Sequence, residues 1–530
     1  MISKVFNDTL NIISNDTDYH HHFFASMVVR HLQEYKIFLK KIGLLGITTI
    51  LVSLNQLILL PVLTQSLSIP DYGVWVQYTI NITIIPAIAV LGLPYTMVRF
   101  LSPQKSREEI QEVFYSLGFT VVLGSLVMAI LFLLGSSFLS KTLFNGNLFV
   151  ALFLPLSIFL NGLTLLFFDF FRTFQEMKRY SFFAFLQAYL AVFMVALLVL
   201  KGYGINGAII GLIISQLILI IAMYVHIFRK IGFKIPLFSN LKEYLNFGLP
   251  TIPTNLSFWI LDITDRYLIG LFLGLSFVSY YSAAYLLGNL ISIIMSPFYT
   301  LLLPNLAFYH AQGRIQKIKT LINYSLKLFL IIAIPLFFLL SILSMPILKV
   351  LSTPEIASGG YFITPILALG GVFFGLYGIM SQVIILEKKT RITGNIWIIC
   401  AVSNLLMDIT FGFFWGIMGI ALTSLAVYIF AFIISLYYSL NYIHLELYPW
   451  FLIKSILTGF LMCIIIIILN PHKPLDIVLT AILGLGFYYL VLWKLGGIQE
   501  KELIFVKSFL EDSQYTLKQL SNSLNDYLKR

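Results

Sequence analysis

Four charged side chains stand inside long apolar stretches of this sequence, where an unpaired charge would cost a few kcal/mol or more. Asp262, Asp265 and Arg266 share one stretch, and Asp408 lies alone in another. Asp262 and Arg266 are four residues apart, so a helix would place them on one face, where they can pair. Arg266 could instead offer its guanidinium to an anionic ligand, with the two acids moderating its charge. A structural ion pair that braces neighbouring helices is the competing interpretation.

Asp408 follows Leu-Leu-Met and precedes Ile-Thr. A carboxyl group that is isolated among apolar residues can take up and release a proton, so Asp408 is a candidate for ion coupling. Asp262 is the second candidate for this role. An acid that is hydrogen-bonded to a neighbouring helix remains the alternative. The chemistry that these residues indicate is binding and coupling, without a bond-breaking step.

Prolines indicate where the helices that carry these groups could break. Pro250 and Pro253 precede the charged cluster, and Pro61 follows two amide side chains in an earlier apolar stretch. Proline removes a backbone donor and kinks a helix, and broken helices line substrate sites in many transporters. Kinks that serve packing alone are the alternative. The candidate residues of a substrate cavity are therefore Asn55, Gln56, Asp262, Asp265 and Arg266.

The elements that position these residues must be membrane-spanning helices. Of the 530 residues, 59% are hydrophobic and 11% are charged, whereas a soluble domain carries about 25% charged residues. About 20 apolar residues are needed to cross the hydrocarbon core. The sequence thus predicts an all-α polytopic membrane protein with about fourteen spans. These lie near 42–66, 75–100, 114–139, 148–171, 181–200, 205–228, 245–272, 277–305, 326–350, 361–386, 392–415, 417–440, 449–470 and 475–494.

The basic residues alternate between the loops that join these spans. Segments expected on one side hold most of the lysines and arginines, among them Lys388, Lys389 and Arg391. This bias predicts that both termini are cytoplasmic. It also accounts for the net charge of +11 through anionic lipid headgroups, and no nucleic-acid motif accompanies it. The loops expected outside keep only Lys141, Lys201, Lys349 and Lys473.

Two short motifs recur at nearly the same offset and indicate a duplication. Glu176–Tyr180 and Glu387–Arg391 precede the fifth and eleventh spans, while Gly204–Gly207 and Gly416–Gly419 follow these spans. Repeats with six helices each would be parallel, related by an axis along the membrane normal. The expected units are a cytoplasmic tail over 1–40, a first six-helix lobe over 41–230, a second over 241–440, helices 13 and 14 over 449–494, and an amphipathic C-terminal helix over 497–530.

Enzyme signatures are absent from the sequence. It contains no Walker lysine loop, no HExxH and no serine hydrolase motif, and the outside loops are too short for a catalytic domain. Cys400 and Cys463 lie within apolar stretches and indicate neither disulfides nor a metal site. We therefore expect a non-enzyme that has no cofactor and no metal.

Five further motifs follow one another in a familiar order. The sequence resembles the Wzx-type oligosaccharide-lipid flippases of the multidrug/oligosaccharidyl-lipid/polysaccharide exporter superfamily over roughly 40–440. The motifs that carry this resemblance are Pro70–Gly73, Leu91–Pro94 with Arg99 and Phe100, Asn246–Pro250, Asp265–Ile269 and Tyr280–Tyr285.

This resemblance implies a substrate in which a polyprenyl or dolichyl phosphate or pyrophosphate carries an oligosaccharide. The substrate would pass from the cytoplasmic to the outer leaflet of the cytoplasmic (inner) membrane by alternating access. Expected partners are this lipid-linked oligosaccharide, membrane lipids, a coupling proton or sodium ion, and glycan-assembly proteins. Beyond Arg266, the several basic cavity residues usual in the family are not evident. A cation-coupled multidrug exporter of the same superfamily and a membrane-embedded polysaccharide polymerase or glycosyltransferase are the alternatives.

Overall fold

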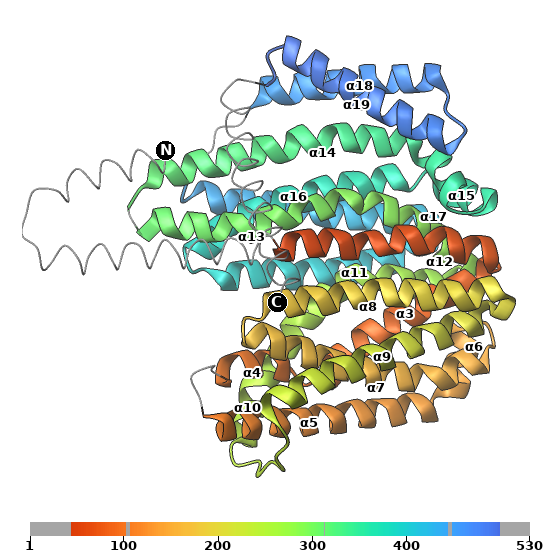
Figure 1. The fold of residues 1–530 in the computed structure, drawn as a ribbon. Helices are drawn as coiled ribbons and strands as arrows, with labels where there is room; N and C mark the ends of the chain where they lie inside the picture. Colours follow the sequence, from red (N-terminus) through yellow and green to blue (C-terminus); the bar gives the residue numbers. More distant parts are fainter. Residues whose placement is uncertain (1–43, 102–105, 312, 444–447, 499–530) are drawn as a thin grey trace, which may run out of the picture.

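The computed structural model describes residues 44–101, 106–311, 313–443 and 448–498, and every regular element in this part of the chain is helical (Figure 1). The expected N-terminal tail, almost all of the expected C-terminal amphipathic helix and parts of three expected inner loops (102–105, 312 and 444–447) lie outside these residues. The first helix is Leu44–Ser66. It is followed by α3 (Ile69–Ala89), α4 (Leu93–Phe100), α5 (Arg107–Leu134), α6 (Ser136–Leu143), α7 (Leu148–Thr173), α8 (Met177–Leu198), the π-helix η1 (Val199–Tyr203), α9 (Gly204–Ile231), α10 (Leu241–Gly248), the 3-10 helix η2 (Leu249–Thr251), α11 (Ile252–Phe272), α12 (Leu275–Gly288), α13 (Leu290–Ala311), α14 (Ile315–Leu351), α15 (Pro354–Gly360), α16 (Thr364–Leu386), α17 (Thr390–Leu440), α18 (Pro449–Leu469) and α19 (Pro474–Lys494).

The expected all-α polytopic membrane fold is confirmed. Ten helical segments among the described residues are long and apolar enough to cross a membrane. Two of them, with 55 and 51 residues, each reverse direction and correspond to two expected spans. The described residues also include α3 and α11, with 21 residues each, at the positions of two further expected spans. Each of the fourteen predicted spans therefore has a helix in the structure.

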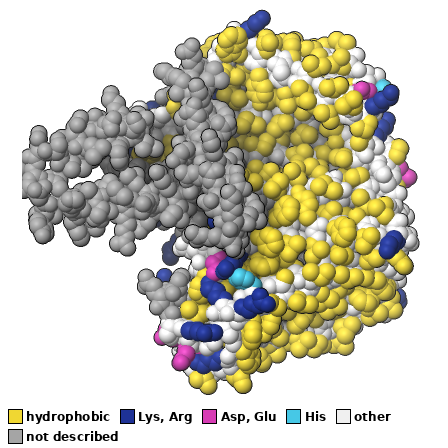
Figure 2. Space-filling model, in the orientation of Figure 1, with side chains coloured by type: hydrophobic (Ala, Val, Ile, Leu, Met, Phe, Trp, Pro, Cys, Tyr) yellow, Lys and Arg dark blue, Asp and Glu magenta, His cyan; other side chains and the backbone are white. Residues whose placement is uncertain are grey.

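Hydrophobic side chains cover most of the visible described surface, and charged side chains gather at its edges (Figure 2). Large exposed side chains on α5, α18 and α19 are mainly leucine, isoleucine, valine and phenylalanine. In the most apolar window of α16, 67% of the residues are buried, against 28% in α18 and in α19. We infer that α16 lies inside the bundle and that α18 and α19 face lipid.

Both reversals occur at a glycine of the repeated motif. Gly204 has φ 55° and ψ −145°, and Gly416 has φ 59° and ψ −142°. Only glycine adopts such angles without strain, which explains its presence at both positions. After each reversal the chain returns along itself, so that α8 packs against α9, and Cys400 Sγ contacts the Val427 carbonyl across α17. The two copies of the glycine motif thus share one backbone geometry at the reversal.

An ion pair closes the other end of the α8–α9 hairpin. Glu176, which directly precedes α8, accepts hydrogen bonds from Arg179 at 2.7 Å and from Lys230 near the end of α9. Although burial raises the pKa of the Glu176 carboxyl, these two hydrogen bonds lower it overall. This charged cluster lies at an end of the hairpin that is expected to be cytoplasmic.

The start of α3 explains the motif Pro70–Gly73. Ser68 caps the helix by accepting a hydrogen bond from the Asp71 amide at 3.2 Å, and Pro70 lies in the first turn. A Cβ added to Gly73 would lie 2.2 Å from the Leu275 carbonyl oxygen, so only glycine lets α3 approach α12 this closely. Because α11 packs against α3, α12 and α17, these contacts position the charged residues of α11.

Candidate substrate and ion-coupling site

Asp265 and Arg266 are adjacent on α11 and are both buried, with 2% and 8% of their surfaces exposed. The Asp262 side chain lies outside the described residues, so the predicted Asp262–Arg266 pair remains a prediction. A charge buried this deeply needs partners, and α12 and α17 provide partners for these two.

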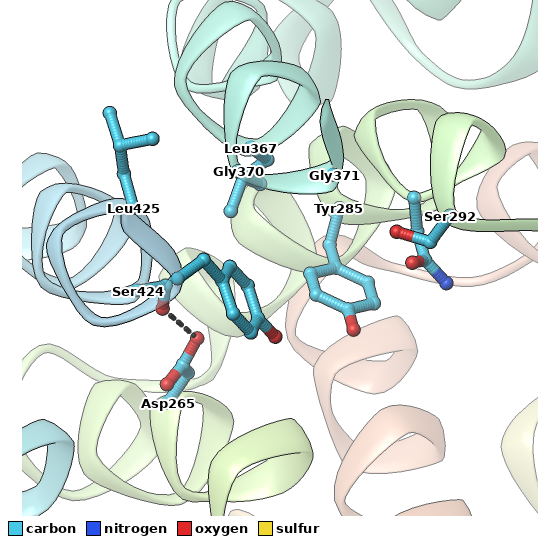
Figure 3. A pocket seen from close by; sticks show the side chains of 10 residues that line it. Asp265, Tyr285, Ser292, Leu367, Gly370, Gly371, Ser424 and Leu425 are labelled. Carbon is cyan, nitrogen blue, oxygen red and sulfur yellow. Dashed lines mark hydrogen bonds between the residues drawn. The ribbon is translucent and has the colours of Figure 1, made fainter. Parts of the chain in front are cut away.

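Asp265 accepts two hydrogen bonds on the same oxygen atom. Tyr281 Oη from α12 donates a hydrogen bond to Asp265 Oδ2. Ser424 Oγ donates to the same oxygen atom at 3.0 Å (Figure 3); Ser424 lies on the second arm of α17, which follows the reversal at Gly416. The other oxygen, Oδ1, is buried and receives no hydrogen bond from a donor in the described part of the chain. One carboxyl group therefore joins α11, α12 and α17.

Asp408 brings a second carboxyl group to the same place. It is fully buried on the first arm of α17, where Thr423 Oγ1 donates to its Oδ1. The Asp265 and Asp408 carboxyl groups lie in hydrogen-bonding contact, and Asp408 Oδ2 also has no donor among the described residues. The expectation that Asp408 is isolated was wrong, because α11 packs against α17 and brings Asp265 to it.

Two buried carboxyl groups in contact repel each other strongly when both are ionised, so the pair needs a positive charge close by. One shared proton would meet this need. The buried Oδ1 of Asn404 also has no donor in the part of the chain described, and it lies one turn before Asp408 on the same face of α17. All three are oxygen atoms of carboxyl or amide groups, the kind of ligand that hard cations prefer. Asn404 was not among the residues predicted from the sequence, although its spacing of four from Asp408 was a usable signal.

Arg266 packs against aromatic rings of α12. Its guanidinium carbon lies 3.8 Å from the centre of the Tyr285 ring and 5.9 Å from that of Tyr281. Such cation–π contacts contribute about 0.5–2 kcal/mol each. The Arg266 carbonyl oxygen accepts a hydrogen bond from Gln77 Nε2 of α3 at 2.7 Å. Arg266 therefore lies between α3 and α12.

A small cavity opens beside this cluster (Figure 3). Its volume is about 20 Å³, which is room for about one water molecule. Arg266 is not among the residues that line it. These are Asp265, Tyr285, Asn289, Ser292, Leu367, Gly370, Gly371, Ser424, Leu425 and Tyr428.

The other predicted site residues lie elsewhere on their helices. Asn55 is half-buried and Gln56 is exposed on the Leu44–Ser66 helix, and no described contact joins them to the acidic pair. This helix continues through Pro61 without interruption. Pro250 lies in the 3-10 helix η2, and Pro253 is at the second position of α11. The chain therefore changes helix type at Pro250, two turns or more before the charged residues.

Residues 38–310, more than half of the chain, match the family described as Polysaccharide biosynthesis protein. The chain belongs to this polysaccharide biosynthesis protein family. Residues 250–410 also match the MatE family. The sequence comparison with curated proteins gives no match. The two family matches confirm the predicted membership of the multidrug/oligosaccharidyl-lipid/polysaccharide exporter superfamily.

Solved structures share the fold of this polysaccharide biosynthesis family member. The lipid II flippase MurJ in an inward closed conformation has a TM-score of 0.66 at 18% identity, over 85% of this chain and 98% of that chain. An inward-facing multidrug resistance MATE family transporter has a TM-score of 0.56 at 14% identity, over 74% of this chain and 97% of that one. A MATE structure in the straight conformation has a TM-score of 0.51 at 14% identity, over 76% and 94%. The first of these is described as a flippase and the second as a transporter.

Proposed function

We propose that this protein is a flippase for a lipid-linked oligosaccharide in surface polysaccharide or glycan biosynthesis. The observation that carries this proposal is the family match over residues 38–310, which contains α11 and its buried charged cluster. The substrate is a polyprenyl or dolichyl phosphate or pyrophosphate that carries an oligosaccharide. The protein moves it from the cytoplasmic to the outer leaflet by alternating access between the halves 41–230 and 241–440.

Arg266 is the proposed ligand of the lipid phosphate. A guanidinium binds a phosphate with two parallel hydrogen bonds, which an ammonium group does not reproduce. The apolar surface of the molecule lets the prenyl tail remain in the bilayer while the sugar crosses between the halves. The proposed substrate-binding residues are Arg266, Asp265, Asp262, Asn55 and Gln56.

The pair of Asp265 and Asp408 is the proposed site of the coupling ion. A proton or a sodium ion satisfies the two carboxyl oxygens that lack donors among the described residues. Because the pair joins α11 to α17, its occupancy changes the attraction between these helices. The ion gradient would in this way drive the conformational cycle.

A cation-coupled multidrug exporter is the second candidate function. The match of residues 250–410 to the MatE family supports it, as do the two acids within that range. In this alternative the carboxyl pair serves the coupling cation, and an organic cation crosses between the halves 41–230 and 241–440. For either function we place the protein in the cytoplasmic membrane with both termini inside. For the flippase, glycan-assembly proteins are its proposed partners.

Reconstitution in liposomes distinguishes the two functions. The substrate is a fluorescent polyprenyl pyrophosphate-linked disaccharide, and the measured quantity is the label that becomes protected from a membrane-impermeant quencher. A charged hydrogen bond contributes about 1.5–3 kcal/mol, so Arg266→Ala should slow translocation about 10- to 100-fold. Arg266→Lys should retain part of the activity. Arg314→Ala, at an exposed loop arginine, is the matched control.

The double variant Asp262→Ala/Arg266→Ala decides whether Arg266 only braces the fold. If it restores translocation, Arg266 is structural and the phosphate ligand is another residue. If the wild-type protein leaves the lipid-linked sugar in place and exports ethidium, the exporter function replaces the flippase.

A further inference from the structure

Two tyrosines on one face of α12 each contact a different charged group of α11. Tyr281 and Tyr285 are four residues apart, and their rings stack at 6.3 Å with an angle of 25° between planes. Tyr281 is fully buried and Tyr285 is partly buried. Because they share a helix face and their rings stack, a movement of α12 displaces both.

Tyr281 is sensitive to the charge of the carboxyl pair. Its hydroxyl donates to Asp265 Oδ2, while Asp265 and Asp408 share a hydrogen-bonding contact. A hydrogen bond to a charged carboxylate is about twice as strong as a bond between neutral groups. A positive charge that settles between the two carboxyl groups therefore weakens the bond that holds Tyr281, and with it α12, to α11.

Tyr285 separates Arg266 from the cavity. The ring lies 3.8 Å from the guanidinium carbon and also lines the cavity, whereas Arg266 does not line it. In Figure 3 the Tyr285 side chain points away from Gly370 and Gly371, which form the part of the wall that has no side chains. A group that approaches from the cavity side therefore meets Tyr285 before it meets Arg266.

We propose that Tyr281 and Tyr285 together couple the state of the carboxyl pair to the exposure of Arg266. When the pair is unoccupied, the Tyr281 bond fixes α12 and the Tyr285 ring covers the guanidinium. When the pair is occupied, α12 is released and the ring moves, which enlarges the cavity and lets Arg266 meet a phosphate-bearing headgroup from that side. Both tyrosines are positioning residues. The identity of the anion rests on the proposed function, but the covering of Arg266 does not.

The modification of Arg266 by phenylglyoxal tests this mechanism on the full-length protein in nanodiscs. The rate is read by mass spectrometry of the Arg266 peptide, and the exposed Arg314 serves as the internal reference. The wild type should react slowly. Tyr281→Phe, which removes only the hydroxyl, and Tyr285→Leu, which removes the ring, should each raise the rate about tenfold or more. Tyr285→Phe keeps the ring and should behave as wild type.

Asp265→Asn neutralises the group that accepts the Tyr281 hydrogen bond, as a bound cation would offset its charge, and should also raise the rate. If Tyr281→Phe and Asp265→Asn are both modified at the wild-type rate, the coupling is overturned. Fast modification of the wild type overturns it as well. Thermal unfolding of each variant excludes a general loss of structure as the cause of fast modification.

Protection by geranyl pyrophosphate, a water-soluble prenyl pyrophosphate, tests the anion separately. It should slow the modification of Arg266 in Tyr285→Leu and leave Arg314 unaffected. If the rates follow the tyrosines as expected but geranyl pyrophosphate gives no protection, the coupling stands and the phosphate-binding role of Arg266 fails.

Discussion

Asp408 and Asp265 place two carboxyl groups in one buried site, which makes Asp408 the sharpest single test of ion coupling. Asp408→Asn keeps the size of the side chain, still accepts from Thr423 and can donate to Asp265. The variant should fold. Its stimulation by an imposed proton or sodium gradient should fall at least about tenfold, because the pair no longer needs a cation. Stimulated and unstimulated rates in liposomes give this comparison.

Asp476→Asn is the matched control, since this acid is exposed in the first turn of α19. If Asp408→Asn responds to the gradient as wild type does, Asp408 is an acid that serves packing only.

At the residue scale the sequence predicted which charges matter but not how they combine. Helical spacing on one stretch pointed to Asp262 and Arg266, whose pairing remains a prediction. The structure instead joins Asp265 to Asp408, which requires that α11 lie against α17. Such a contact between distant segments leaves no local periodicity in the sequence. Within α17, the spacing of Asn404 and Asp408 did carry the signal.

At the element scale the contact between α3 and α12 depends on one glycine. In Gly73→Ala the new methyl group would lie 2.2 Å from the Leu275 carbonyl oxygen, so the backbones must separate. We expect a loss of about 1–3 kcal/mol in the free energy of unfolding, as for other overpacked sites. The measurement is the midpoint of thermal unfolding in detergent, which should fall by several degrees.

Gly394→Ala in α17 is the matched control, because no atom lies within 4 Å of its added Cβ. It should be neutral or stabilising by about 0.5–1 kcal/mol, since alanine favours the helix. Equal midpoints for the two variants would show that α3 and α12 are not held by this contact.

The helices were largely predictable because apolar length is a local property of the sequence. The breaks within the predicted spans were harder to predict. The expected span 75–100 is divided into α3 and α4 near Gly92, with φ 67°, and the span 114–139 is divided at Gly135. Apolar residues surround both positions, so composition alone does not separate the pieces. At Gly416 the repeated motif supplied the missing signal.

At the scale of the whole molecule, the order of the helices along the chain does not determine their neighbours. The contacts of α3 with α11 and α12 join the two halves of the sequence, and the sequence repeat does not predict them. The side of the membrane on which each loop lies is a separate property. It depends on the lysines and arginines, which are retained on the cytoplasmic side.

This charge rule makes the topology testable with two single cysteines. Asn145, between α6 and α7, and Gln316, in the first turn of α14, are both exposed, and they lie in segments that should face opposite sides. In a Cys400→Ala/Cys463→Ala background, a membrane-impermeant maleimide should label Asn145→Cys in intact cells. It should label Gln316→Cys only after the cells are opened, because Arg314 and Lys317 keep that loop inside. Labelling of Gln316→Cys from outside would show that the loop before α14 lies on the outer side of the membrane, contrary to the predicted topology. It would also reverse the side from which the proposed lipid-linked substrate reaches Arg266.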